Sequence, residues 1–168
     1  CTVILPQGVL FHGGKEGDMR RQLIESDKLE CVIALAGGLF YGAGVSACIL
    51  YLNNNKAPSR AGKICLIDAS EIYTPQRAQK IMSDENVGEA YRLFENFTDV
   101  VGRSKVVTIE ELKSHDYTLS VNTYIEKPPV PPMDPAKVRS DYFAALENVK
   151  VCEETLYALL QKGGYIDG

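Results

Sequence analysis

The stretch 31-CVIALAGGLFYGAGVSACILYL-52 decides the fold of this chain. It contains a short apolar run, Cys31 to Leu35, and a longer one, Val45 to Leu52, separated by a segment with four glycines. Apolar runs of this length that are bounded by glycine are typical of strands buried on both faces of a sheet. The short connection predicts that the second strand runs antiparallel to the first.

The connection between these strands carries an aromatic pair, Phe40 and Tyr41. A turn does not require aromatic residues, and loops carry functional residues more often than strands do. One ring could fold back and cover the ends of the strands, or it could stack on a ligand. Residue type alone favours the first interpretation and leaves the second open.

The residues before this stretch predict a strand at 2–5 and an amphipathic helix at about 17–26. The helix residues expected to face the core are Met19, Leu23 and Ile24, and those expected to face water are Arg20, Arg21, Gln22 and Glu25. Strand, helix and strand in succession predict a parallel pair of strands joined by a right-handed crossover. The chain is therefore expected to be an α/β protein.

The residues after this stretch predict a further strand at 63–68 and then mainly helices. Ser83 is a good N-cap for a helix that ends near Phe97, and residues 108–111 form a capping box. Residues 117–125 alternate loosely and are expected to be extended. Three parts follow: residues 1–126 form the sheet domain, 127–133 a stiff proline-rich linker, and 134–168 a long C-terminal helix.

The predicted C-terminal helix has an apolar seam with heptad spacing. Its residues lie alternately four and three positions apart, as in the a and d positions of a coiled coil. They are Val138, Tyr142, Ala145, Val149, Cys152, Leu156 and Leu159. This seam predicts contact with a helix of a partner protein, and packing on its own domain is the alternative.

The composition excludes several classes of function. A net charge of −4 gives no overall electrostatic footprint for an independent nucleic-acid-binding module. Five widely spaced cysteines are typical of reduced thiols in a cytoplasmic protein, and two distant histidines make a metal site improbable. No segment is long and apolar enough to predict a signal peptide or a membrane span.

The sequence lacks the common short motifs of catalytic and nucleotide-binding sites. It has no GxGxxG or phosphate-binding GxxxxGK[ST] motif, and no GxSxG motif. The strand predicted at residues 2–5 begins almost at once, without a polar lead-in. We therefore expect part of an α/β sheet that begins inside a domain and has no self-contained active site.

Several stretches, in order, resemble the modification (M) subunits of type I restriction–modification systems. The segment 3–11, VILPQGVLF, is similar to their LPxGVLF motif, and 39–50 is similar to LFYGTGIxTxIL. Residues 66–70, LIDAS, are similar to FIDAS, and the likeness continues through 106–112 and 117–124. It is collinear from residue 2 to about residue 125 and weakens after the prolines.

This resemblance implies a fold and an activity. Such subunits are S-adenosylmethionine-dependent DNA methyltransferases with a Rossmann-like sheet, and they transfer a methyl group to N6 of adenine. Their glycine-rich cofactor motif and their Asn-Pro-Pro-Phe motif precede the LPxGVLF stretch and are not found here. The resemblance thus implies the C-terminal half of such a sheet with a helical tail, which is inactive and binds no cofactor alone.

The resemblance also implies site residues and partners. Phe40 matches the position of an aromatic ring that stacks on the flipped adenine, and Tyr41 is the runner-up. The implied partners are the specificity (S) and restriction (R) subunits, with double-stranded DNA bound through the complex. The alternative is a non-catalytic assembly module that docks a helical partner subunit through the seam.

Overall fold

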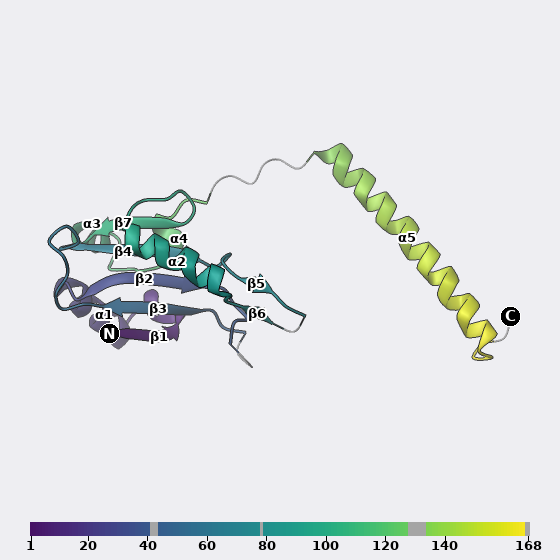
Figure 1. Ribbon diagram of the computed structural model, residues 1–168, viewed down its shortest axis with the longest axis horizontal. Helices are drawn as coiled ribbons and strands as arrows, with labels where there is room; N and C mark the ends of the chain where they lie inside the picture. Colours follow the sequence, from purple (N-terminus) through teal and green to yellow (C-terminus); the bar gives the residue numbers. More distant parts are fainter. Residues whose placement is uncertain (41–43, 78, 128–133, 167–168) are drawn as a thin grey trace. The chain divides into compact units, whose positions relative to one another are not determined.

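A computed structural model describes residues 1–40, 44–77, 79–127 and 134–166. The chain divides into two compact units, Cys1–Pro128 and Pro129–Gly168. The first unit is a mixed sheet with helices, and the second contains one long helix (Figure 1). The predicted linker, 127–133, falls around this division, and all of it except Lys127 lies outside the described residues.

The main sheet of the first unit has five strands. Their spatial order is β1 (Thr2–Pro6), β3 (Ala47–Leu52), β2 (Leu29–Leu35), β4 (Lys63–Ala69) and β7 (Ser104–Thr108). Strand β3 runs antiparallel to its neighbours β1 and β2. Strands β2 and β4 are parallel to each other, and β7 is antiparallel to β4. The antiparallel pairing predicted for the two apolar runs of the opening stretch is confirmed.

The predicted parallel pair of β1 and β2 is wrong. Both strands are antiparallel to β3, so they point the same way, but β3 lies between them. The glycine-rich connection allows β3 to turn back beside β2, and its other edge then pairs with β1. Local patterns predicted the directions of the strands. Which strands are neighbours depended on the pairing of β1 with β3, between residues more than 40 positions apart.

Side chains of β2 alternate between the two faces of the sheet, as the pleat requires. Val32 and Ala34 join the core cluster that contains Ile24 of α1 and Leu112 of α3. Ile33, on the opposite face, packs in the clusters that contain Leu93 of α2. Both faces of the sheet are therefore partly covered by helices, which is why the central strands β2 and β3 are mainly apolar.

Helix α1 (Lys15–Glu25) follows a short 3-10 helix, η1 (Gln7–Leu10), and presents an unexpected face to the core. Met19 is 71% exposed, whereas Arg20 is only 9% exposed. The prediction that Met19 faces inward and Arg20 faces water is therefore wrong. Arg20 is buried because its guanidinium group finds three carbonyl acceptors, which are described below.

Helix α2 (Asp84–Asn96) crosses the other face of the sheet (Figure 1). Its N-cap is Ser83, as predicted, and a capping box joins Ser83 to Asn86. A small hairpin, β5 (Thr74–Pro75) and β6 (Lys80–Ile81), precedes the helix.

Two short helices complete the unit, α3 (Ile109–Ser114) and α4 (Val121–Tyr124). The prediction that residues 117–125 are extended is wrong, because part of this segment forms α4. Thr108 caps α3 as predicted, and it accepts the N–H of Glu111.

The second unit consists of α5 (Pro135–Lys162) and its flanking residues. Asp134 caps this helix and Pro135 occupies its first turn, as the sequence predicts. Considered by itself, α5 has no buried residue.

Candidate functional site

The connection between β2 and β3 is held firmly at its base. Gln7, at the end of β1, donates its side-chain amide to the carbonyl oxygens of Leu35 (3.1 Å) and Ala47 (3.3 Å). The backbone N–H of Gln7 donates to the carbonyl oxygen of Ser46 at 3.0 Å. The turn itself uses Gly38 at a φ of 80°, where a side chain would be strained. The strand ends therefore form a rigid platform for the loop.

Phe40 projects from this platform. Its side chain is 43% exposed, whereas the preceding Leu39 packs against the cluster of Leu35, Ala47, Ala69 and Ile72. Leu39 thus covers the strand ends, which is the role that the sequence suggested for an aromatic ring. Tyr41, the second candidate, lies outside the described residues.

Asp68 lies at the same edge of the sheet, because it pairs in register with Ala34 near the end of β2. Its carboxylate accepts the N–H of Ser70 at 2.9 Å and lies 3.4 Å from the ammonium of Lys127. Burial alone would raise the pKa of Asp68, but the hydrogen bonds of Ser70 and the charge of Lys127 outweigh it, so that the pKa is lowered. Asp68 is therefore an anchored carboxylate, and sequence reasoning did not single it out.

The β5–β6 hairpin contacts the base of the Phe40 connection. The N–H of Lys80 donates to the carbonyl oxygen of Gly38 at 3.2 Å, and the Lys80 ammonium lies 4.0 Å from the centroid of the Tyr73 ring. Arg77, in the turn of the hairpin, is exposed. A hairpin this short has no strong sequence signal, which is why sequence reasoning missed it.

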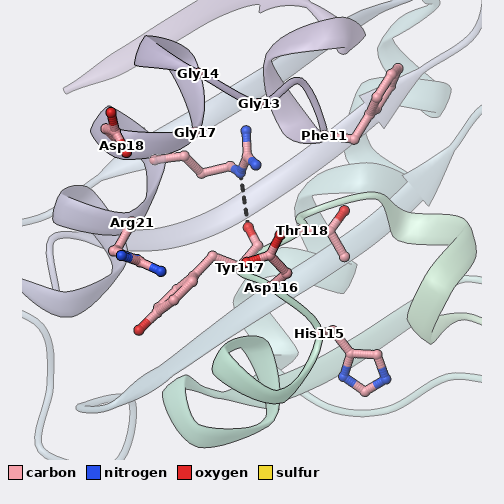
Figure 2. Close-up of a pocket in the computed structure, with 11 residues that line it drawn as sticks. Phe11, Gly13, Gly14, Gly17, Asp18, Arg21, His115, Asp116, Tyr117 and Thr118 are labelled. Carbon is pink, nitrogen blue, oxygen red and sulfur yellow. Dashed lines mark hydrogen bonds between the residues drawn. The ribbon is translucent and has the colours of Figure 1, made fainter.

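A polar pocket of about 240 Å³ lies between α1 and the segment after α3 (Figure 2). The Arg20 guanidinium donates to the carbonyl oxygens of Tyr117 (2.8 Å), Val9 (2.9 Å) and His12 (2.8 Å). Figure 2 shows the first of these bonds as a dashed line. Burial lowers the pKa of Arg20, although Asp116 and Glu16 act in the opposite direction. Nε and Nη1 of Arg20 are engaged by these backbone carbonyls, so Arg20 joins three segments of the fold.

The cysteines give no sign of a reactive thiol in the sheet. Cys31, Cys48 and Cys65 are buried, as predicted for strand residues. Burial raises the pKa of Cys48 to about 11, even though a backbone hydrogen bond partly offsets it. Burial and the neighbouring Cys65 also raise the pKa of Cys31. The raised pKa values keep the Cys31 and Cys48 thiols protonated, which makes them poor nucleophiles.

The residues that the structure describes contain neither a cluster of metal-ligating side chains nor a helix that could span a membrane. Among these residues, no group of three or more histidine, cysteine or acidic side chains is placed to hold a metal ion. The described helices include none with the length and apolar character needed to cross a membrane.

The seam residues of α5 follow one another along the helix, as the spacing requires. In the helix considered by itself, Tyr142 and Leu159 are among the most exposed apolar residues. Exposed apolar side chains also lie away from the seam, at the b positions Phe143 and Tyr157. The apolar surface of α5 is therefore wider than a two-helix seam requires.

The first unit has the mixed sheet and flanking helices of a Rossmann-like methyltransferase fold. Residues 1–131 match the N-6 DNA Methylase family, and the chain belongs to that family. The sequence-based resemblance to type I modification subunits is thereby confirmed.

Individual relatives agree with this assignment. The chain is 33% identical over 169 residues to the type I restriction enzyme MjaVII methylase subunit of Methanocaldococcus jannaschii. This alignment covers 99% of the chain and 28% of the relative. The chain is 40% identical over 126 residues to the MjaVIII methylase subunit of the same organism, covering 73% of the chain and 22% of the relative. The chain thus spans about a quarter of these relatives.

Solved structures show the same fold. A type I restriction–modification methyltransferase subunit from Streptococcus thermophilus matches with a TM-score of 0.69 and 26% identity, over 74% of this chain and 26% of that one. The EcoKI M protein matches with a TM-score of 0.57 and 18% identity, over 92% of this chain and 40% of that one. At this identity the second match supports the fold alone.

Proposed function

We propose that this chain is the C-terminal part of the modification subunit of a type I restriction–modification enzyme. The complete subunit transfers a methyl group from S-adenosylmethionine to N6 of adenine in DNA, in the cytoplasm. The main support for the proposal is the family match, together with an edge strand, β1, beside which further strands can pair. The relatives are about four times as long as this chain, and the remaining sheet belongs to the part that this chain does not span.

Strand β1 forms one edge of the sheet, and β7 forms the other. Among the described residues, β1 pairs only with β3. Beside it, each face of the sheet has an apolar hollow of about 380 Å³, one lined by Ile49 and Tyr91 and the other by Leu5 and Met19. Apolar surface of this kind marks a contact site. A further strand with helices on both faces would pair with β1 and fill both hollows.

Phe40 is the residue that we propose to receive the target base. An enzyme that methylates the amino group of adenine must take the base out of the duplex. An exposed ring on a rigid turn can stack on the extruded base, which is worth about 1–3 kcal/mol. Tyr41 remains the second candidate for this role.

We propose that the described residues alone do not bind S-adenosylmethionine. A nucleoside site at the carboxyl ends of parallel strands uses a carboxylate that is free to accept ribose hydroxyls. Asp68 is at the carboxyl end of β4, but it is committed to Ser70 and Lys127. We therefore expect calorimetry to detect no cofactor binding by these 168 residues. Micromolar affinity would contradict the proposed division of the active site.

The role of Phe40 is tested by Phe40→Ala in the complete enzyme. We expect kcat/KM to fall by about 5- to 150-fold, which corresponds to the stacking energy. Fluorescence of 2-aminopurine at the target position should change as well, since it reports both base flipping and stacking of the flipped base. Phe40→Trp should retain activity. Phe11→Ala removes another exposed ring (56%, against 43% for Phe40) as the control. Unchanged methylation and unchanged flipping in Phe40→Ala would remove Phe40 from the site.

The second proposed role is assembly through α5. The exposed apolar surface of this helix favours a helical partner, for which we propose the S subunit, with the R subunit and DNA joining through the complex. A related solved structure concerns complex assembly and conformational transition of the type I system. The alternative is that the chain has no part in catalysis and is an assembly module that docks a helical partner subunit through α5.

Paired substitutions on α5 test the assembly role. Val149→Lys with Leu156→Lys places two charges in the seam and should abolish co-purification with the S subunit, as should deletion of residues 134–168. Glu147→Lys with Glu154→Lys introduces the same residues on the opposite side of the heptad and should leave the complex intact. An intact complex with the seam variant would refute the assignment.

A further inference from the structure

The β5–β6 hairpin, defined as residues 73–82, is fixed in place by contacts at both of its strands. On β6, the N–H of Lys80 donates to the carbonyl oxygen of Gly38 at 3.2 Å. On β5, the Thr74 hydroxyl donates to the side-chain oxygen of Asn86 at 2.8 Å, in the first turn of α2. Figure 1 shows the hairpin beside the ends of β2 and β3. The hairpin is therefore joined to the turn that carries Phe40, two residues from that ring.

The hairpin is cationic within an acidic chain. Its segment contains Arg77 and Lys80 and no acidic residue, although the net charge of the whole chain is −4. Among the described residues, neither cation forms an ion pair with a protein carboxylate. Arg77 is exposed, and Lys80 lies over the Tyr73 ring without a carboxylate partner in the described part of the chain, so both positive charges are available to an anionic ligand.

Acidic residues flank the hairpin but are already accommodated. Glu71 lies 3.8 Å from the Lys127 ammonium. Asp84 is in the first turn of α2, where the helix dipole stabilises a negative charge. Neither of them neutralises the turn of the hairpin.

The charge of the hairpin complements the chemistry of the Phe40 connection. Residues 36–47 contain no charged side chain, so this connection can stack on a base but cannot neutralise a phosphate. A nucleotide that leaves the duplex rotates about its backbone and brings its phosphates with it. Arginine and lysine are the residues that bind phosphates in most protein–DNA complexes.

We propose that the β5–β6 hairpin binds the sugar–phosphate backbone of DNA next to the flipped base, with Arg77 and Lys80 contacting phosphates. The proposal rests on the proposed function. The two contacts hold the backbone while the Phe40 ring holds the base. They carry no sequence specificity, because phosphates are the same at every site.

Salt dependence of DNA binding tests this proposal in the complete modification subunit assembled with its S subunit. The double variant Arg77→Gln and Lys80→Gln should reduce the slope of log K against log salt by about 0.9 for each lost phosphate contact. The loss of two contacts should change the slope by about 1.8. Between 50 and 200 mM salt, the affinity of the variant should therefore fall by a factor about ten times smaller than that of the parent. The reduced slope is expected on target DNA, where the base leaves the duplex.

Two controls keep the result interpretable. Lys28→Gln with Lys113→Gln removes two exposed charges from the opposite end of the sheet and should leave the slope unchanged. The variant Arg77→Lys with Lys80→Arg keeps both charges and should have the same salt slope as the parent. A salt slope in the Gln variant equal to that of the parent overturns the inference.

The proposed function fails in a different way. If the parent enzyme does not methylate DNA with S-adenosylmethionine, the proposed function is wrong, whereas a reduced salt slope in the Gln variant still supports the hairpin as a DNA contact. If the parent methylates DNA and the slopes agree, the hairpin proposal is wrong and the function stands. If the parent binds no DNA, both are overturned.

Discussion

Replacement of Arg20 by methionine should lower the free energy of unfolding of the first unit by about 3 kcal/mol. The guanidinium joins three segments, since its acceptors are the carbonyl oxygens of Val9, His12 and Tyr117. Methionine keeps most of the unbranched stem but donates no hydrogen bond. The variant therefore isolates the contribution of the donors from that of the packing.

The magnitude follows from the burial of each bond. A hydrogen bond to a charged group is worth about 1.5–3 kcal/mol. The bond to Tyr117 is buried and counts for about 2 kcal/mol, and each of the two half-buried bonds counts for about 1 kcal/mol because water can replace it. The variant also relieves the desolvation that lowers the pKa of Arg20, which reduces the expected loss to about 3 kcal/mol.

Urea unfolding followed by circular dichroism measures this effect. The midpoint should fall with an unchanged m-value, and Tm should fall by about 10 °C. The matched control is Arg21→Met, because Arg21 is exposed and only lies over the Tyr117 ring at 4.8 Å. Such a contact is worth about 0.5–1 kcal/mol. If the two variants lose the same stability, the three carbonyl contacts do not stabilise the fold.

Two further predictions concern single contacts. Ser83→Ala removes the acceptor for the N–H of Asn86 and should cost about 1 kcal/mol of stability in the same urea assay; a change below about 0.3 kcal/mol would show that the cap is dispensable. Because the pKa of Asp68 is lowered in the folded state, its contribution to stability is present above its ordinary pKa of 3.8 and is lost as the pH falls through the lower, folded value. Lys127→Met should raise the pKa of Asp68 in a carbon-13 NMR titration and move acid unfolding to higher pH, and an unchanged titration would contradict the ion pair.

Local patterns in the sequence were sufficient for most of the elements. The apolar runs around residues 31–35 and 63–68 became strands, because a buried strand needs apolar side chains on both faces. The run at residues 2–5 became a strand at the edge of the sheet. The caps at Ser83 and Asp134 began helices, since their oxygens accept backbone N–H groups within the same turn. These contacts join residues close in sequence, so the residues themselves carry the signal.

The sequence also determined the family, through motifs in a fixed order, and identified Phe40 as a candidate. Only the tertiary structure decided that β3 lies between β1 and β2, that Arg20 is buried and that Met19 is exposed. Arg20 finds its buried acceptor at Tyr117, 97 positions away, and no periodicity within α1 can reveal a partner at that distance. The opening stretch thus predicted two antiparallel strands by local chemistry. Its neighbours, and the charged hairpin that contacts its turn at Gly38, depended on long-range packing.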